Sequence, residues 1–167
     1  SGKTFFMITD GYLQNSDLGA ADTTPYVDAD DYIWIKSNAD VLIGNNPGGA
    51  PLNVQNRKIV VFIDGNLTVD GEVNIGNNGF AMFIVRGNIL VSPTVGAPNN
   101  ASTSPNVSGI YFTDGQFSTG TTNSNSDKRI NFYGSFVALG TGLSDAFLLQ
   151  RDLVDIDNQT IPAETFT

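Results

Sequence analysis

Short runs of alternating hydrophobic and polar residues make up most of this chain, and turn-forming residues separate them. The stretch VFIDGNLTVDG (61–71) is followed by FIVRGNILVSP (83–93), and each holds an alternating run, a Gly-Asn pair and a second alternating run. Alternation with a period of two, bounded by Gly, Pro, Asn and Ser, is typical of β-strands. Helical spacing occurs at 143–153, where Ser144 could cap a short helix. The pattern predicts an all-β domain with, at most, a short terminal helix.

The two stretches are copies of one repeat. Aligning the glycine after each first run gives Gly65, Gly87, Gly115 and Gly134, at steps of 22, 28 and 19 residues. Coils of about this length are typical of parallel β-helices, in which each turn stacks on the last at roughly 4.8 Å. We therefore predict one right-handed parallel β-helix, or β-solenoid, over residues 1–167, and we call each of its turns a rung.

The predicted domain has three parts. Residues 1–57 supply N-terminal strands or a cap, 58–142 form the repeated rungs, and 143–167 form a C-terminal cap. The longest step contains the polar, Pro-rich segment 92–109, which indicates a loop extruded from one corner.

The aligned positions also predict what fills the interior and the corner. Alternate positions such as Val61 and Phe83, or Leu67 and Ile89, would point into the coil, and the glycine would permit the corner. Amide side chains follow the corner glycine and could hydrogen-bond from rung to rung. The residues after the glycine are Asn66, Asn88, Gln116 and Ser135, and those before it are Asp64, Arg86 and Asp114.

The charged column has two interpretations. Asp64 and Asp114 would lie two rungs apart, about 9.6 Å, which is near the separation of the carboxylates in an inverting glycosidase. Arg86 would lie between them and keep both ionised, which removes the raised-pKa acid that such a mechanism needs. We therefore expect a structural charge ladder and no enzyme.

Composition narrows the chemistry further. The chain has 8 Lys and Arg against 17 Asp and Glu, a net charge of −9, and neither Cys nor His. Thiol and imidazole catalysis and zinc sites built on those residues are excluded. An acidic chain repels nucleic acid and anionic lipid, and no apolar run approaches a membrane span. The strand-like pattern starts directly after Ser1 and Gly2, and we expect a fragment excised from a larger protein.

Three groups of oxygen-bearing side chains are candidates for calcium binding. Carboxylates and amides are ligands that Ca²⁺ prefers, but none of the groups has the glycine and distal glutamate of an EF-hand loop. Solvated turn carboxylates are the competing interpretation, and no other cofactor is predicted. The groups are Asp28, Asp30 and Asp31; Asn123, Asn125 and Asp127; and Asp152, Asp155 and Asp157.

Aromatic side chains give a candidate contact surface. In YIWIK, Tyr32 and Trp34 would share the outer face of a strand if Ile33 and Ile35 point inward. Exposed aromatics of this kind bind sugar rings or protein partners, whereas a covering cap or loop would make them structural. A cross-link between Lys3 or Lys58 and an asparagine is a further open alternative.

Longer phrases carry a family resemblance. VFIDGNLTVDGEVNIGNNG, FIVRGNILVSPTV, SGIYFTDGQFSTG and GSFVALG resemble β-helical segments of pilus-assembly and prepilin-like bacterial surface proteins. The tail FLLQRDLVDIDNQTIPAETF resembles the ending of such segments in bacteria of the candidate phyla. The resemblance covers roughly 58–166. It implies no catalytic residues and an extracellular structural or adhesive module.

We therefore expect a non-catalytic module of a bacterial surface or pilus-like protein, located at the cell surface. Its partners would be other surface-protein domains or glycans of host or cell surfaces. The alternative is a carbohydrate-binding or carbohydrate-degrading β-helix, which would carry a groove with clustered charges and exposed aromatics. A self-assembling solenoid of the bactofilin type is a further rival, and the loop at 92–109 argues against its short, regular rungs.

Overall fold

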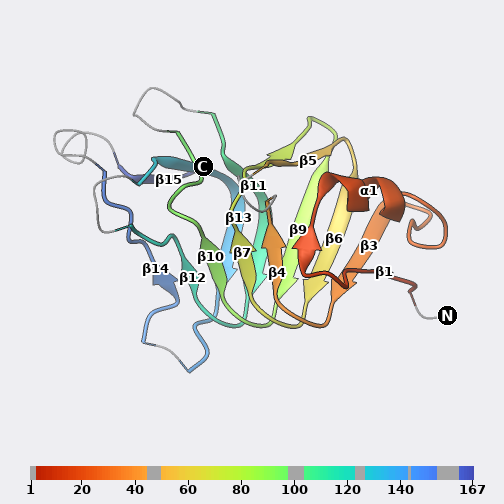
Figure 1. Cartoon of the computed structure of the whole chain (residues 1–167), viewed down its shortest axis with the longest axis horizontal. Helices are drawn as coiled ribbons and strands as arrows, with labels where there is room; N and C mark the ends of the chain where they lie inside the picture. The colour runs from red at the N-terminus through yellow and green to blue at the C-terminus, as the bar shows by residue number, and fades with distance from the viewer. Residues whose placement is uncertain (1–2, 45–49, 98–103, 123–126, 143, 154–161) are drawn as a thin grey trace.

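The computed structural model describes residues 3–44, 50–97, 104–122, 127–142, 144–153 and 162–167. These residues form a β-solenoid of about five rungs, which confirms the predicted fold class. The rungs follow one another from the N-terminal end, at the right of Figure 1, to the C-terminal end at the left. Strands of successive rungs pair in parallel, so segments more than twenty residues apart in the sequence lie side by side.

Two sheets run the length of the solenoid. We call them the long sheet and the short sheet, and one helix, α1 (Asn15–Ala21), packs at the N-terminal end. In order, the long sheet contains β1 (Phe6–Met7), β3 (Tyr32–Ser37), β6 (Lys58–Ile63), β9 (Phe80–Val85), β11 (Val107–Thr113), β13 (Ile130–Ala138) and β15 (Glu164–Phe166), and β5 (Leu52–Gln55) and β8 (Val73–Ile75) join it through β11. The short sheet contains β14 (Phe147–Leu148), β12 (Phe117–Ser118), β10 (Ile89–Val91), β7 (Leu67–Val69), β4 (Val41–Ile43) and β2 (Tyr12–Leu13).

A complete rung has three sides. The strands β6, β7 and β8 form one such rung, and β3, β4 and β5 form the rung before it. In the following rung, β11 begins with Val107 beside Val73 of β8 and then continues directly into the long sheet. The inserted loop therefore lies between β10 and the third side of this rung.

The core consists of stacked columns of inward-facing side chains. Alternation places Ile33, Ile59 and Ala81 in one column, all at most 1% exposed. Phe83 and Ile89 are fully buried, as the repeat predicted. Aromatic rings continue the stack across rungs: Phe83 lies 4.8 Å from Tyr111, and Tyr111 lies 5.0 Å from Phe136, between ring centroids. The interior is therefore contiguous from one end of the solenoid to the other.

The corner glycines stack as predicted for three of the four positions. The N–H of Gly87 donates to the carbonyl of Gly65 at 2.8 Å, and that of Gly115 donates to Gly87 at 3.2 Å. The next corner is Gly140, whose N–H lies 2.9 Å from the oxygen of Gly115. The assignment of Gly134 to this column was wrong, because Gly134 pairs with Gly109 in the middle of β13. The strand β13 is long, and Gly134, the glycine within it, lies before the corner.

Other boundaries also differ from the sequence prediction. The loop assigned to 92–109 ends earlier, because 107–109 already belong to β11 and Val107 is fully buried. The part of 143–153 that the structure describes contains no helix and instead includes strand β14, which pairs with β12. The N-terminal strands predicted within 1–57 are present, and β3, β4 and β5 form a rung of their own. No helix in the described part of the chain is long and apolar enough to cross a membrane.

Candidate binding face

The side chains of the long sheet that point away from the core form a regular grid, which we call the outer face. Parallel pairing without register shifts aligns β3, β6, β9, β11 and β13, so equivalent residues form rows across the strands. Two adjoining central rows are mostly apolar, and their side chains are at least partly exposed except that of Val60, which is buried. The first is Trp34, Val60, Met82, Ile110 and Ser135, and the second is Lys36, Phe62, Ile84, Phe112 and Val137.

Charged side chains border these two rows. Lys58 lies beside Tyr32 and Phe80 at the start of the strands. Asp64, Arg86 and Asp114 follow the strand ends, each with its N–H bonded to the preceding rung. The outer face thus has an apolar centre between a rim that holds Lys58 at the strand starts and a rim of alternating charges at the strand ends.

Two hollows open on the outer face. One, of about 680 Å³, has Ser108, Gly109 and Gly134 among its lining residues, with the rings of Phe80 and Tyr133 beside them. The other, of about 340 Å³, lies between Phe62, Phe112 and the charged rim. Tyr133 is 56% exposed, so its ring is available to a partner.

The predicted contact residues Tyr32 and Trp34 lie on the outer face, and neighbouring side chains partly cover them. The Trp34 ring stacks on Phe62 with centroids 6.2 Å apart and an interplanar angle of 15°. Phe5 packs edge-on against both rings, and the Lys3 ammonium lies 4.5 Å from the centre of the Trp34 ring. The N-terminal segment therefore already occupies one end of the outer face.

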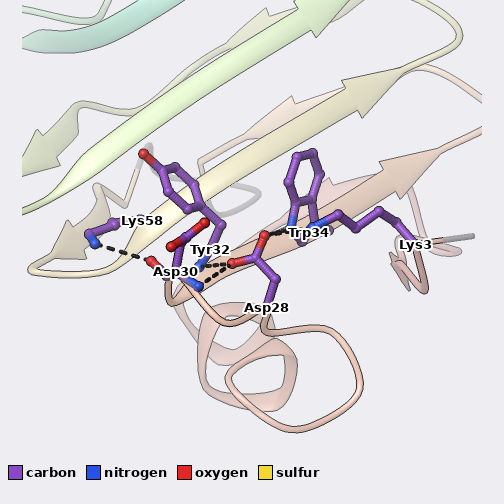
Figure 2. Close-up of polar contacts among 6 residues, drawn as sticks. All are labelled: Lys3, Asp28, Asp30, Tyr32, Trp34 and Lys58. Carbon is purple, nitrogen blue, oxygen red and sulfur yellow. Dashed lines mark hydrogen bonds and ion pairs between the residues drawn. The ribbon is translucent and has the colours of Figure 1, made fainter. Parts of the chain in front are cut away.

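Asp28 holds this aromatic group in place (Figure 2). Its Oδ2 accepts hydrogen bonds from Lys3 Nζ at 2.7 Å and from Trp34 Nε1 at 2.8 Å. Its Oδ1 accepts the backbone N–H groups of Asp30 and Tyr32 at 2.9 and 3.1 Å. The hydrogen bond from Lys3, helped by those from Trp34 and the backbone, holds the pKa of Asp28 well below its usual range despite some desolvation. The carboxylate therefore remains ionised and its oxygens are engaged.

These contacts bear on the predicted calcium sites. Asp28 uses both oxygens for protein donors, and the Asp30 carbonyl accepts Lys58 Nζ at 3.1 Å. In the second group, Asp127 accepts hydrogen bonds from Thr122 and from the N–H of Asp152. Within the described ranges, no three acidic side chains gather as a metal site would require. Asn123, Asn125, Asp155 and Asp157 lie outside the described residues.

The amides at the corner form a ladder between rungs. The side-chain oxygen of Asn66 accepts the N–H of Asn88 at 2.8 Å, and that of Asn88 accepts the N–H of Gln116 at 2.9 Å. Sequence reasoning missed both ends. Asp40 accepts the N–H of Asn66 at 2.7 Å, and Gln116 donates to the carbonyl of Asp145 at 2.9 Å. The pair Ala39-Asp40 stands where later rungs have Gly-Asn, and this similarity is the signal that could have found the first end.

The Asp64–Arg86 part of the predicted charge ladder is present as an ion pair. Arg86 Nη1 lies 2.8 Å from Asp64 Oδ1, and both side chains are well exposed. The hydrogen bond and charge of Asp64, with a smaller effect of Asp114, raise the pKa of Arg86. Lys3 and Lys58 contact Asp28 and the Asp30 backbone, so their described contacts do not include the asparagine of a cross-link.

A buried arginine that sequence reasoning missed ties the C-terminal segment to the loop corner. Arg151 is 7% exposed, and its guanidinium donates to the carbonyls of Ser92, Val95 and Lys128 at 2.6 Å each. Burial lowers the pKa of Arg151 to about 10, so it stays charged at neutral pH, and nearby Glu164 opposes this shift. This arginine is a clamp between rungs, and its position in QRDL gives no sequence signal of that role.

Comparison with known proteins leaves the family open: no family model, curated protein or solved structure matches the chain. The outer face is therefore the feature of the molecule from which a function can be inferred.

Proposed function

We propose that this chain is a non-catalytic structural or adhesive module of a bacterial surface or pilus-like protein, working outside the cell. The observation that carries the proposal is the outer face. Water-facing positions of a parallel sheet are expected to be polar, whereas here two neighbouring rows of a sheet face are largely apolar. A contiguous apolar surface that extends over several strands is typical of interaction sites. The partners are other surface-protein domains or cell-surface glycans.

The rest of the solenoid holds that face rigidly. Each rung is tied to the next by backbone pairing, a filled core and the corner ladder, so the grid of outer side chains has a fixed spacing. A preorganised surface loses little conformational entropy when a partner binds. The contacts of the charge ladder also favour a structural role over catalysis, because Asp64 is engaged in an ion pair with Arg86.

The test uses the immobilised chain against a panel of bacterial surface proteins, this chain itself, and neutral and acidic surface glycans. We expect binding that is lost in Ile84→Lys, on the outer face. The matched control is Leu90→Lys, which places the same charge on the outside of the short sheet and should leave binding intact. Absence of any binding, or equal losses in the two variants, would overturn the proposal. So would polysaccharide cleavage that Asp64→Asn or Asp114→Asn abolishes.

A carbohydrate-binding module is the second candidate, and the larger hollow favours it. Phe80 and Tyr133 stand on strands two positions apart in the sheet, about 9.6 Å. A sugar ring that contacts an aromatic ring on each of its two faces needs about 4 Å on each side, and the separation of these strands leaves room for it. If this candidate holds, Tyr133→Ala and Phe80→Ala will each weaken glycan binding, and the distant Phe147→Ala will not.

A further inference from the structure

We propose that the outer face binds a second copy of this chain. In the resulting two-fold dimer, β9 of one copy lies opposite β9 of the other and runs antiparallel to it. This proposal rests on the proposed function, because it names the partner of the same face. Three observations carry it: the area of the outer face, the local charge, and the order of the rows.

The area is sufficient for a stable dimer. Five strands at about 4.8 Å and four rows at about 6.6 Å span about 600 Å², counting the two rim rows and the end over which the N-terminal segment packs. Two copies would bury about 1,200 Å², which is the lower end of specific stable interfaces. The central rows supply apolar contacts of Met82, Ile84, Ile110 and Phe112, all of which are only partly buried in the single chain.

The charge of the outer face suits an acidic partner of the same kind. The rows contain Lys36, Lys58 and Arg86 against Asp64 and Asp114, which gives 3 − 2 = +1, on a chain whose net charge is −9. The rest of the chain then carries −9 − 1 = −10, so two copies repel one another less through this face than through an average part of the remaining surface. Approach through the outer face is therefore electrostatically preferred.

The row order selects the arrangement. A two-fold axis across the strands, between Met82 and Ile84, reverses the rows and keeps each strand opposite its own copy. Lys58, the first residue of β6, then lies opposite Asp64 of the second copy, which directly follows β6. Met82 lies opposite Ile84 of the second copy. Each contact occurs twice, because a two-fold interface is self-complementary.

The alternative two-fold axis is disfavoured by charge. An axis along the strands would reverse the strand order and keep the rows, so β6 would face β11. Asp64 would then lie opposite Asp114 of the second copy, and like charges placed across an interface weaken it. The antiparallel arrangement avoids this repulsion and gains two pairs of opposite charge.

The experiment measures the mass of the whole chain by sedimentation over a range of concentrations. We expect a dimer that Ile84→Lys converts to a monomer and that Leu90→Lys leaves unchanged. Lys58→Asp or Asp64→Lys alone should weaken the dimer about tenfold or more by placing like charges together. The double variant exchanges the two charges and should recover most of the wild-type affinity. Circular dichroism and Trp34 fluorescence of each variant verify that it is folded.

Each alternative result has a defined meaning. A monomer at all concentrations, or a dimer unaffected by Ile84→Lys, would overturn the proposal. Failure of the double charge exchange to recover association would overturn the antiparallel arrangement. A monomer that still binds a glycan or another surface protein through the outer face would refute the dimer and leave the proposed function standing. A monomer that binds nothing would refute both.

Discussion

The stacked core predicts a large difference between two neighbouring residues of β10. Ile89 is fully buried and aligns with Leu67 on one side and Phe117 on the other, whereas Leu90 is 39% exposed on the outside of the short sheet. Truncation of either isomeric side chain to alanine removes the same number of carbon atoms. Ile89→Ala should cost about 2–5 kcal/mol, because a cavity opens between rungs that cannot collapse independently. Leu90→Ala should cost about 1 kcal/mol or less.

The assay is urea denaturation followed by the fluorescence of Trp34, the single tryptophan. With a slope of about 2 kcal/mol per molar urea, the midpoint should fall by about 1–2.5 M for Ile89→Ala and by about 0.5 M or less for Leu90→Ala. Unequal slopes would indicate that the rungs no longer unfold together. Equal midpoints, or a larger fall for Leu90→Ala, would refute the inward and outward assignment and with it the register of the short sheet.

Three further predictions concern the corner, the clamp and the pH dependence. Gly115→Ala should destabilise the chain more than Asn88→Ala in the same titration, because a Cβ there would lie 2.7 Å from the backbone oxygen of Gly87, whereas loss of the Asn88 acceptor costs about 1 kcal/mol. Arg151→Met and Arg151→Lys should both lose about 3 kcal/mol in thermal unfolding, since an ammonium cannot reproduce the fork that reaches three carbonyls; full stability in the lysine variant would contradict the clamp. The lowered pKa of Asp28 means that its contribution to stability is complete above its ordinary pKa of 3.8 and is lost as pH falls through the lower folded-state pKa. Wild type and Asp28→Asn should therefore differ in stability at neutral pH and converge in acid below about pH 4, and a constant difference would refute the assignment.

The sequence predicted the solenoid because its rungs repeat the same local solution. Val61 and Phe83, or Leu67 and Ile89, occupy the same positions in successive rungs, and the Gly-Asn pair marks the corner each time. The need for glycine at the corner was predicted, but its physical reason was not. A Cβ at these positions would collide with the backbone of the preceding rung, and that distance between backbones cannot be derived from the sequence.

The errors came from positions where the repeat is interrupted. Gly134 stands in a run that looks like the others, but an enlarged β13 places the true corner at Gly140. The residues at 143–153 have helical spacing, but strand pairing prevails there because Phe147 extends the short sheet beside Phe117. Arg151 could not be predicted as a clamp, since its carbonyl partners lie more than twenty residues away in the chain.

The outer face, by contrast, could have been predicted from the sequence more fully than from Tyr32 and Trp34 alone. A strand with one face in water should alternate, but β6 reads KIVVFI and β9 reads FAMFIV, with apolar residues at inward and outward positions alike. Near-continuous apolar runs are typical of parallel strands that are covered on both faces. In the described structure the inner positions of β9 are covered by the core, while Met82 and Ile84 remain partly exposed. Apolar residues at the outward positions of β6 and β9 are therefore what we expect if a partner covers the outer face, as proposed above.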